Sequence, residues 1–162
     1  MSKPVCFIMG VSGTGKTTIG KLLSKELGIP FFDGDDYHSK ENIEKMASGQ
    51  PLNDDDRFGW LAKLNLLAKE HKTKGGIIAC SALKEKYRIQ LTTDIETDTR
   101  FIYLKGSFAE IKERLDSRDN HYMTSTLLKS QFDALEPPKK AITVSIMETP
   151  KQIVKEILSQ LK

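Results

Sequence analysis

A glycine-rich segment that ends in a lysine and two threonines is the first part of the chain whose residue types could do chemistry. Residues 10–17 follow the pattern G-x-x-x-x-G-K-[ST] at every required position. Glycines let the backbone curl until successive N–H groups point at phosphate oxygens, and a helix starting at Gly15 adds the positive end of its dipole. Lys16 can reach the β- and γ-phosphates, and the Thr17 hydroxyl can ligate Mg²⁺. We therefore expect a nucleoside triphosphate to bind at Gly10, Val11, Ser12, Gly13, Thr14, Gly15, Lys16, Thr17 and Thr18.

Two aspartates separated by one glycine follow the second apolar run of the chain. Phe31 and Phe32 predict a short strand, and Asp33-Gly34-Asp35 comes directly after it. In a parallel sheet this places both carboxylates beside the phosphate loop. Alternation along an extended turn would send Asp33 and Asp35 to one side, where one could hold Mg²⁺ through water and the other could accept the proton of an attacking hydroxyl. Solvated turns also use these residue types, so this interpretation depends on the phosphate loop.

The phosphate loop alone leaves three classes open: a small-molecule kinase, a GTPase switch and an ATPase motor. The guanine-reading pattern N-K-x-D is absent, and the switch-like D-x-x-G at residues 56–59 follows a polar segment instead of a strand. Motor ATPases usually place a carboxylate at the end of a central apolar strand, whereas the run at residues 76–80 continues into Ser-Ala-Leu-Lys. The sequence therefore favours a kinase. A nucleotide-binding regulatory protein without catalysis is the alternative from another class.

The elements around these residues are predicted from apolar periodicity. Short apolar runs predict strands at residues 4–9, 31–32, 76–80, 100–104 and 141–146. Helical spacing and capping residues predict helices that include residues 15–27, 39–48, 60–68 and 151–161, with a polar loop at 50–57. Such alternation predicts an α/β fold with a mainly parallel sheet covered by helices on both faces. Ligands then gather at the carboxyl ends of the strands.

Composition bounds the remaining possibilities. The 162 residues suit a single compact domain, and 38% hydrophobic with 29% charged residues is ordinary for a globular protein. A net charge of +3 is too small to predict a nucleic-acid or membrane partner. Every apolar run is shorter than a signal-peptide core or a membrane span, so we expect a cytoplasmic protein. Cys6 and Cys80 lie in strand-like runs and are expected to be buried thiols.

Further blocks extend in order along nearly the whole chain. They comprise residues 9–17, Asp33-Gly34-Asp35 with His38, residues 42–49, residues 51–57 with Trp60-Leu61, residues 80–84 with Tyr87-Arg88, residues 103–106, residues 121–123, and Gln131-Phe132 with Leu135-Glu136. Through these blocks the chain resembles the gluconokinases of the compact P-loop type, which are similar in fold to shikimate kinase and related to the adenylate-kinase group. The long central block is far more specific than the phosphate loop.

The resemblance implies a fold, a reaction and its cofactors. The fold is a three-layer P-loop kinase domain over residues 1–162, with strand order 2-3-1-4-5, a substrate-binding segment at about 36–60 and a short lid at about 118–137. The reaction is phosphorylation of D-gluconate by ATP with Mg²⁺ to give 6-phospho-D-gluconate, and similar enzymes are often homodimers. A same-fold kinase for shikimate or another small hydroxy acid is the close alternative. Against shikimate, Ser81-Ala82-Leu83 stands where shikimate kinases normally carry three glycines.

Roles for the nucleotide side follow from the same resemblance. A helix expected from Ser107 carries Arg114 and Arg118 four residues apart, and therefore on one face. Such a pair could clamp a nucleotide, and the resemblance assigns Arg114 to the adenine and Arg118 to the phosphates; a solvated helix that pairs them with glutamates is the alternative. Asp33 would hold Mg²⁺ through water, together with Thr17. The residues expected at the chemistry are Lys16, Asp35 and Arg118.

The acceptor side needs a cationic group and several polar ones, because gluconate carries a carboxylate and a row of hydroxyls. Arg57 is the first candidate for the carboxylate because it closes the most specific block. Lys84 and Arg88 come next, just after the third strand, and His38, with the loop at residues 53–56, could bind hydroxyls.

Overall fold

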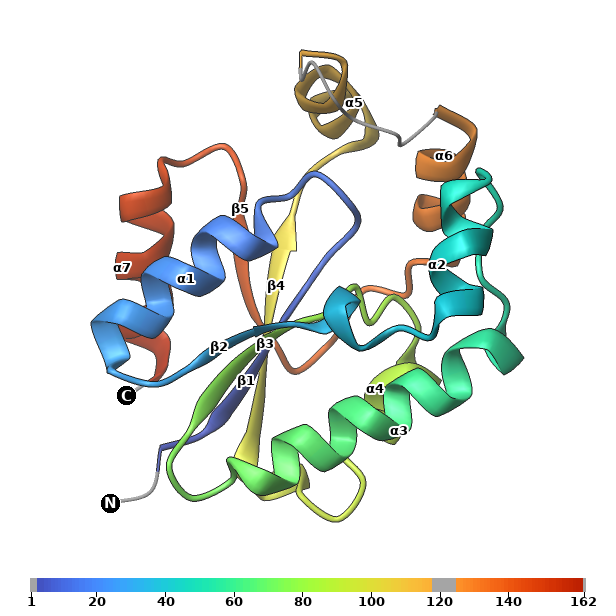
Figure 1. Cartoon of the computed structure of the whole chain (residues 1–162). Helices are drawn as coiled ribbons and strands as arrows, with labels where there is room; N and C mark the ends of the chain where they lie inside the picture. Colours follow the sequence, from blue (N-terminus) through green and yellow to red (C-terminus); the bar gives the residue numbers. More distant parts are fainter. Residues whose placement is uncertain (1–2, 118–124, 162) are drawn as a thin grey trace.

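A parallel sheet forms the centre of the computed structural model, which describes residues 3–117 and 125–161 (Figure 1). Its strands are β1 (Val5–Met9), β2 (Phe31–Asp33), β3 (Gly76–Ala79), β4 (Thr99–Lys105) and β5 (Ile142–Ser145). They lie in the order β2-β3-β1-β4-β5, and each neighbouring pair is parallel. The structure confirms the α/β class and the expected strand order.

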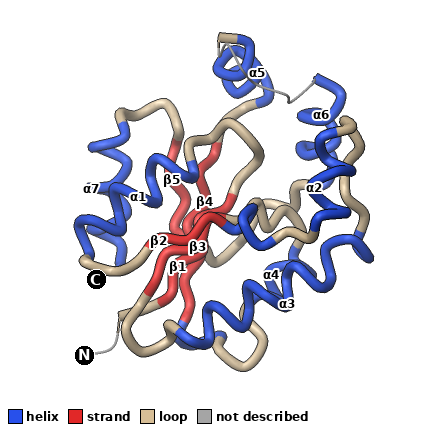
Figure 2. The backbone as a smooth tube through the Cα atoms, in the orientation of Figure 1, coloured by secondary structure: helices blue, strands red, loops and turns tan. Residues whose placement is uncertain are grey.

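Two layers of helices cover the sheet, and strand alternation determines which residues face each layer (Figures 1 and 2). Cys6 and Ile8 of β1 pack with α1 (Lys16–Leu27) and α7 (Pro150–Leu161) on one face. Their neighbours Val5, Phe7 and Met9 pack with α3 (Asp54–Glu70) and α4 (Glu85–Leu91) on the other. All five β1 residues are buried, as expected for a central strand covered on both faces. This explains why β1 is a continuous apolar run.

The remaining helices lie toward the carboxyl ends of the strands (Figure 1). They are the short 3₁₀ helix η1 (Gly34–Tyr37), α2 (Lys40–Ala47), α5 (Phe108–Asp116) and α6 (Ser125–Ala134), while a second 3₁₀ turn, η2 (Glu96–Asp98), precedes β4. Of the segment expected as a lid, residues 125–134 form α6, and residues 118–124 lie outside the described part of the chain. At this end of the sheet, α5 and α6 contact the phosphate loop.

The polar loop expected at residues 50–57 is shorter than predicted, because α3 begins at Asp54. Asn53 caps this helix: its side chain accepts from the Asp56 N–H at 2.8 Å, and the Asp56 carboxylate accepts from the Asn53 N–H at 2.9 Å. Three aspartates in the first turn also stabilise the helix, because their negative charges interact favourably with the positive end of the helix dipole. The run of acidic residues therefore starts a helix, and Arg57 is helical.

Both cysteines are buried free thiols, as predicted. Burial raises the pKa of Cys6 and of Cys80 to about 12, so both thiols stay protonated at neutral pH. Within the described ranges, no helix is both long and apolar enough to cross a bilayer.

Candidate active site

A cavity of about 290 Å³ opens where the carboxyl ends of β2 and β3 meet the phosphate loop and the start of α1. Gly13 and Gly15 adopt φ values of +86° and +92°, which side chains other than glycine rarely tolerate. These two residues let the loop curl into the start of α1, so the cavity lies at the N-terminus of a helix. The cavity is lined by Ser12, Gly13, Gly15, Lys16, Thr17, Thr18, Asp33, Asp35, Ala79, Cys80 and Ser81.

Three of the residues predicted to bind nucleotide, Gly10, Val11 and Thr14, do not line the cavity. Val11 and Thr14 are buried, and the Thr14 hydroxyl donates to the Val11 carbonyl at 3.0 Å. Lys16 Nζ donates to the carbonyls of Gly10 and Val11 at 2.9 and 3.0 Å. Burial lowers the pKa of Lys16, while the nearby charges of Asp35 and Asp33 act in the opposite direction. The lysine is thus held under the loop by the curled backbone.

The two aspartates reach the cavity by a different geometry from the one predicted. We expected an extended turn, but β2 ends at Asp33 and the chain turns at once into η1. The Asp33 carboxylate caps this turn by accepting from the Asp35 N–H at 3.0 Å. Gly34 is required for space, because a Cβ there would lie 2.4 Å from the Ala79 carbonyl oxygen. Close packing of η1 on β3, instead of strand alternation, brings Asp33 and Asp35 to one cavity.

Asp35 combines access to solvent with a raised pKa. Its side chain is 79% exposed toward the open cleft, so an acceptor molecule can reach it. Partial desolvation by the surrounding protein raises the pKa of this carboxyl, because it disfavours the charged form. The negative charge of Asp33 raises the pKa further, and the positive charge of Lys16 opposes both effects. A carboxylate with a raised pKa accepts a proton more readily, which suits a general base.

Trp60 and His38 hold η1 in place. The Trp60 indole N–H donates to the Gly34 carbonyl at 2.7 Å, and its ring stacks on His38 with centroids 4.0 Å apart. Asn42 Nδ2 lies 3.4 Å from His38 Nδ1 and donates to the Asp56 carbonyl at 2.7 Å, which links α2 to α3. His38 Nε2 is 3.7 Å from an Asp35 carboxylate oxygen. His38 therefore lies next to Asp35, and its role in binding the acceptor stays a prediction.

The environment of His38 predicts a pH-dependent stability. Burial, then Arg57, lower the pKa of His38 from 6.5 to about 4, so the folded protein binds fewer protons here than the unfolded chain. The lowered pKa of His38 therefore contributes to the free energy of unfolding, and this contribution is complete above pH 6.5. It is lost as the pH falls toward 4, by about 3 kcal/mol in all. We expect urea unfolding followed by Trp60 fluorescence to show this loss. In His38→Gln, stability should fall less over the same pH range; equal losses in both proteins would contradict the assignment.

Arg57 and Lys84, predicted to bind the acceptor, lie around Tyr87. Arg57 donates to the Leu52 carbonyl and, at 3.1 Å, to the Tyr87 hydroxyl, which in turn donates to Asp54. The guanidinium carbon lies 5.1 Å from the centre of the Tyr87 ring, and Lys84 Nζ lies 5.8 Å from it. Both positive charges thus lie within cation–π range of one tyrosine ring. Tyr87 was not predicted to have a role in the site. The one feature of the sequence that could have indicated such a role is its position in a block that resembles the gluconokinases.

Arg88 is held differently from the other predicted acceptor residues. It is buried, and it donates to the carbonyls of Ala82 and Glu136 at 2.7 and 2.8 Å. Ala82 has φ +48°, an unusual conformation for alanine. Arg88 therefore supports the turn after β3, which carries Ser81 and Lys84. Its predicted contact with substrate stays a prediction.

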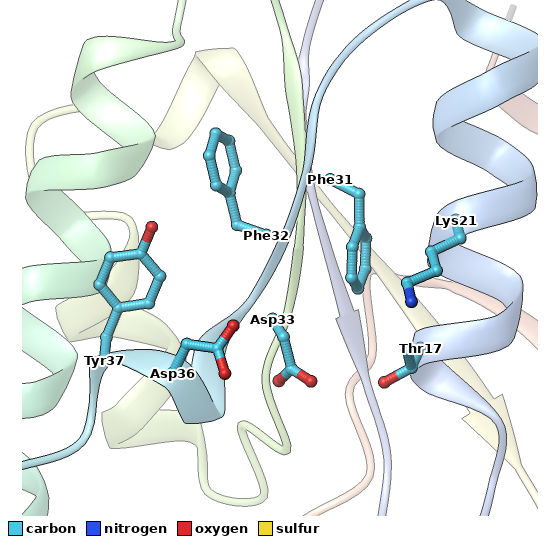
Figure 3. Close-up of a pocket in the computed structure, with 7 residues that line it drawn as sticks. All are labelled: Thr17, Lys21, Phe31, Phe32, Asp33, Asp36 and Tyr37. Atoms are coloured by element: carbon cyan, nitrogen blue, oxygen red, sulfur yellow. The ribbon is translucent and has the colours of Figure 1, made fainter.

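A second hollow of about 270 Å³ adjoins the first and shares Thr17 and Asp33 with it (Figure 3). The figure shows the Asp33 carboxylate and the Thr17 hydroxyl turned toward the same space. Hard oxygen donors of this kind suit Mg²⁺, which proteins usually bind through one or two such groups together with the phosphates of the substrate. The hollow is lined by Thr17, Lys21, Phe31, Phe32, Asp33, Asp36 and Tyr37.

The arginine pair was predicted from a helix that is shorter than expected. Helix α5 ends at Asp116, with Ser117 as its C-cap. The expectation that one helical face carries both arginines extends past the described residues and stays a prediction. Arg114 donates to the carbonyl of Ile146, the residue that follows β5. Arg118 lies outside the described residues. The nucleotide roles of both arginines stay predictions.

Comparisons with known proteins show which family the chain belongs to. A family model described as shikimate kinase matches residues 12–162. The probable gluconokinase of Xenopus tropicalis is 43% identical, over 94% of this chain and 90% of its own length. The thermoresistant gluconokinase of Escherichia coli K12 is 45% identical, over 81% of this chain and 75% of its own length. The chain belongs to the gluconokinase family.

A solved structure of the gluconokinase family has the same fold. The crystal structure of a gluconokinase from Sinorhizobium meliloti 1021 matches with a TM-score of 0.89 at 36% identity, covering 98% of this chain and 91% of that chain. The resemblance stated from the sequence blocks is therefore confirmed at the level of family and fold.

Proposed function

We propose that this protein transfers the γ-phosphoryl group of ATP to D-gluconate and forms 6-phospho-D-gluconate and ADP. The observation that carries this conclusion is one cavity lined by a phosphate loop with its lysine and by the accessible carboxylate of Asp35. Membership in the gluconokinase family supports gluconate as the acceptor. A cytoplasmic location and a homodimeric assembly stay predictions from the sequence.

The residues of the cavity can divide the reaction between them. The acceptor hydroxyl oxygen attacks the γ-phosphorus, its proton passes to Asp35, and the bond from the γ-phosphorus to the bridging oxygen breaks with its electron pair leaving on ADP. Lys16 would neutralise charge on the transferring group. Thr17 and, through water, Asp33 would hold Mg²⁺, which supplies further positive charge at the phosphates. Arg118 is proposed to add a charge at the phosphates.

The acceptor carboxylate is proposed to bind near Arg57 and Lys84. The charge of Arg57 contributes to the lowered pKa of His38, and it partly opposes the rise that burial causes in the pKa of Cys80, a cavity residue. A guanidinium can bind a carboxylate through two parallel hydrogen bonds, which fixes the orientation of the acceptor. His38 would contact a hydroxyl next to Asp35.

A substrate panel tests the activity. ADP release should be measured with ATP and Mg²⁺ against gluconate, shikimate and nucleoside monophosphates. We expect turnover with gluconate and background rates with the others. Turnover with shikimate would favour the alternative suggested by the name of the family model. ATP binding without turnover of any acceptor would favour the regulatory alternative.

Arg57→Ala tests the carboxylate anchor. Loss of a charged hydrogen bond should raise the KM for gluconate by roughly 10- to 100-fold, with a smaller effect on the KM for ATP. Steady-state kinetics with each substrate varied in turn measures both values. Lys63→Ala removes an exposed charge from the same helix and serves as the control. An unchanged gluconate KM in Arg57→Ala would move the anchor to another residue, and Lys84→Ala is the next variant to measure.

A further inference from the structure

Gln131 on α6 makes a two-point contact with the phosphate loop, 119 residues away in sequence. The Ser12 N–H donates to Gln131 Oε1 at 2.7 Å, and Gln131 Nε2 donates to the Ser12 hydroxyl at 3.1 Å. Together these bonds hold both the peptide plane and the side chain of Ser12. Since Ser12 lines the cavity, Gln131 acts on a residue at the wall of the phosphate site.

Apolar packing determines where Gln131 lies. Leu128, one turn earlier on α6, is fully buried in the same cluster as Val11 of the loop. Phe132 makes an edge contact with Phe108 of α5, with ring centroids 5.6 Å apart. A Cβ on Gly13 would lie 3.1 to 3.2 Å from side-chain atoms of Ile111 and Leu115, so α5 packs tightly on the same loop. Gln131 is therefore held against Ser12 by the packing of two helices.

The segment that follows Gln131 is fastened to the acceptor side of the cavity. The Glu136 N–H donates to the Leu83 carbonyl at 2.7 Å, and the Glu136 carboxylate accepts from the Glu85 N–H at 2.8 Å. Arg88 donates to the Glu136 carbonyl at 2.8 Å. These three bonds join Glu136 to α4 and to the connection before it, which carries Lys84. One short segment thus connects the phosphate loop with the candidate anchor of the acceptor.

The orientation of Ser12 matters for phosphate binding. A phosphate loop works because its N–H groups are oriented before the ligand arrives, and the N–H of Ser12 is directed to Gln131. Without a partner, this peptide is free to rotate and the loop loses part of its order. The side chain of Gln131 is neutral, so it fixes the loop without adding charge to the phosphate site.

We infer that Gln131 is a positioning residue for phosphoryl transfer: it holds Ser12 and thereby the shape of the phosphate loop. Residues 131–136 also keep the phosphate loop at a fixed spacing from the turn that carries Lys84. This role concerns the nucleotide, so it rests on the phosphate loop and is independent of which acceptor is phosphorylated.

Gln131→Leu tests this role, because leucine is similar in size and favours a helix, while it removes both hydrogen bonds. We expect the dissociation constants of ATP and ADP, measured by calorimetry without acceptor, to rise roughly 10-fold. The KM for gluconate should stay within about 2-fold of wild type, which separates this role from a contact with the acceptor. Lys129→Ala, an exposed position on the same helix, is the matched control and should bind ATP like the wild type.

Ser12→Ala gives a second measurement if the α6 variant folds poorly. It removes one of the two hydrogen bonds and keeps the N–H, so it should weaken ATP binding by roughly 3-fold. In the double variant Ser12→Ala/Gln131→Leu, the loss should be no larger than in Gln131→Leu alone, because both changes break one contact. Fully additive losses would overturn the inference.

Two other results would also overturn it. ATP binding as tight as or tighter than wild type in Gln131→Leu would mean that the contact does not support the loop or that it competes with phosphate. A raised gluconate KM with unchanged ATP affinity would place Gln131 at the acceptor. ATP and ADP binding are measured without gluconate. The test of Gln131 can therefore still be interpreted if the substrate panel shows no turnover of gluconate.

Discussion

Replacing Asp35 by asparagine should lower kcat for gluconate phosphorylation by roughly 10³-fold and leave the dissociation constant of ATP within about 3-fold of wild type. Asparagine keeps the size of the side chain but cannot accept the proton of the attacking hydroxyl. ATP binding should persist because the phosphate loop, including Lys16, is unchanged. Stopped assays of ADP release give kcat, and calorimetry gives the affinity.

The neighbouring residue Asp36 provides a control for the Asp35→Asn variant. Asp36 lies on the same 3₁₀ turn but lines the hollow shown in Figure 3 and not the cavity that contains Lys16. Asp36→Asn should therefore lower kcat far less than Asp35→Asn. Asp116→Asn, a change at an exposed ion pair on α5, controls for general effects of charge. Near-normal turnover in Asp35→Asn would remove Asp35 from the mechanism, and equal losses in Asp35→Asn and Asp36→Asn would point to a shared structural effect.

Replacing Lys16 by methionine should lower kcat by roughly 10³-fold and also weaken ATP binding. The ammonium group is the one cation that lines the cavity within the described residues, and it lies under the loop that would hold the phosphates. Methionine fills a similar volume without a charge, so the loss should report electrostatics more than packing. Rapid-quench measurement of a single turnover separates the chemical step from product release.

Two comparisons bound the Lys16 result. Lys25→Ala, an exposed lysine in the last turn of the same helix, should behave like wild type. Lys16 Nζ also donates to the Gly10 and Val11 carbonyls, so a thermal melt of Lys16→Met is needed to measure any loss of stability. A folded Lys16→Met protein with unchanged kcat would remove the lysine from the transition state.

Features that depend on neighbouring residues in sequence were predictable. The phosphate loop, the strand before it and the helix after it follow from spacing and residue type alone, and Gly13 and Gly15 have the backbone angles that this pattern requires. The alternation of apolar runs and helical stripes was sufficient to predict the parallel sheet. The start of α3 was missed, although Asn53 and Asp56 form a capping box, because the acidic run was interpreted as a loop.

Contacts between distant segments were decided by the tertiary structure. The two aspartates reach one cavity because Gly34 packs against the carbonyl of Ala79 and Trp60 donates to the Gly34 carbonyl, neither of which a local pattern specifies. Arg57 contacts Tyr87, which is 30 positions away in the sequence, and Gln131 contacts Ser12, which is 119 positions away. The sequence by itself determined that a phosphate loop forms and that a carboxylate follows the second strand, since both depend on local backbone conformation. Which side chains surround them depends on helix packing over the sheet, which only the folded chain establishes.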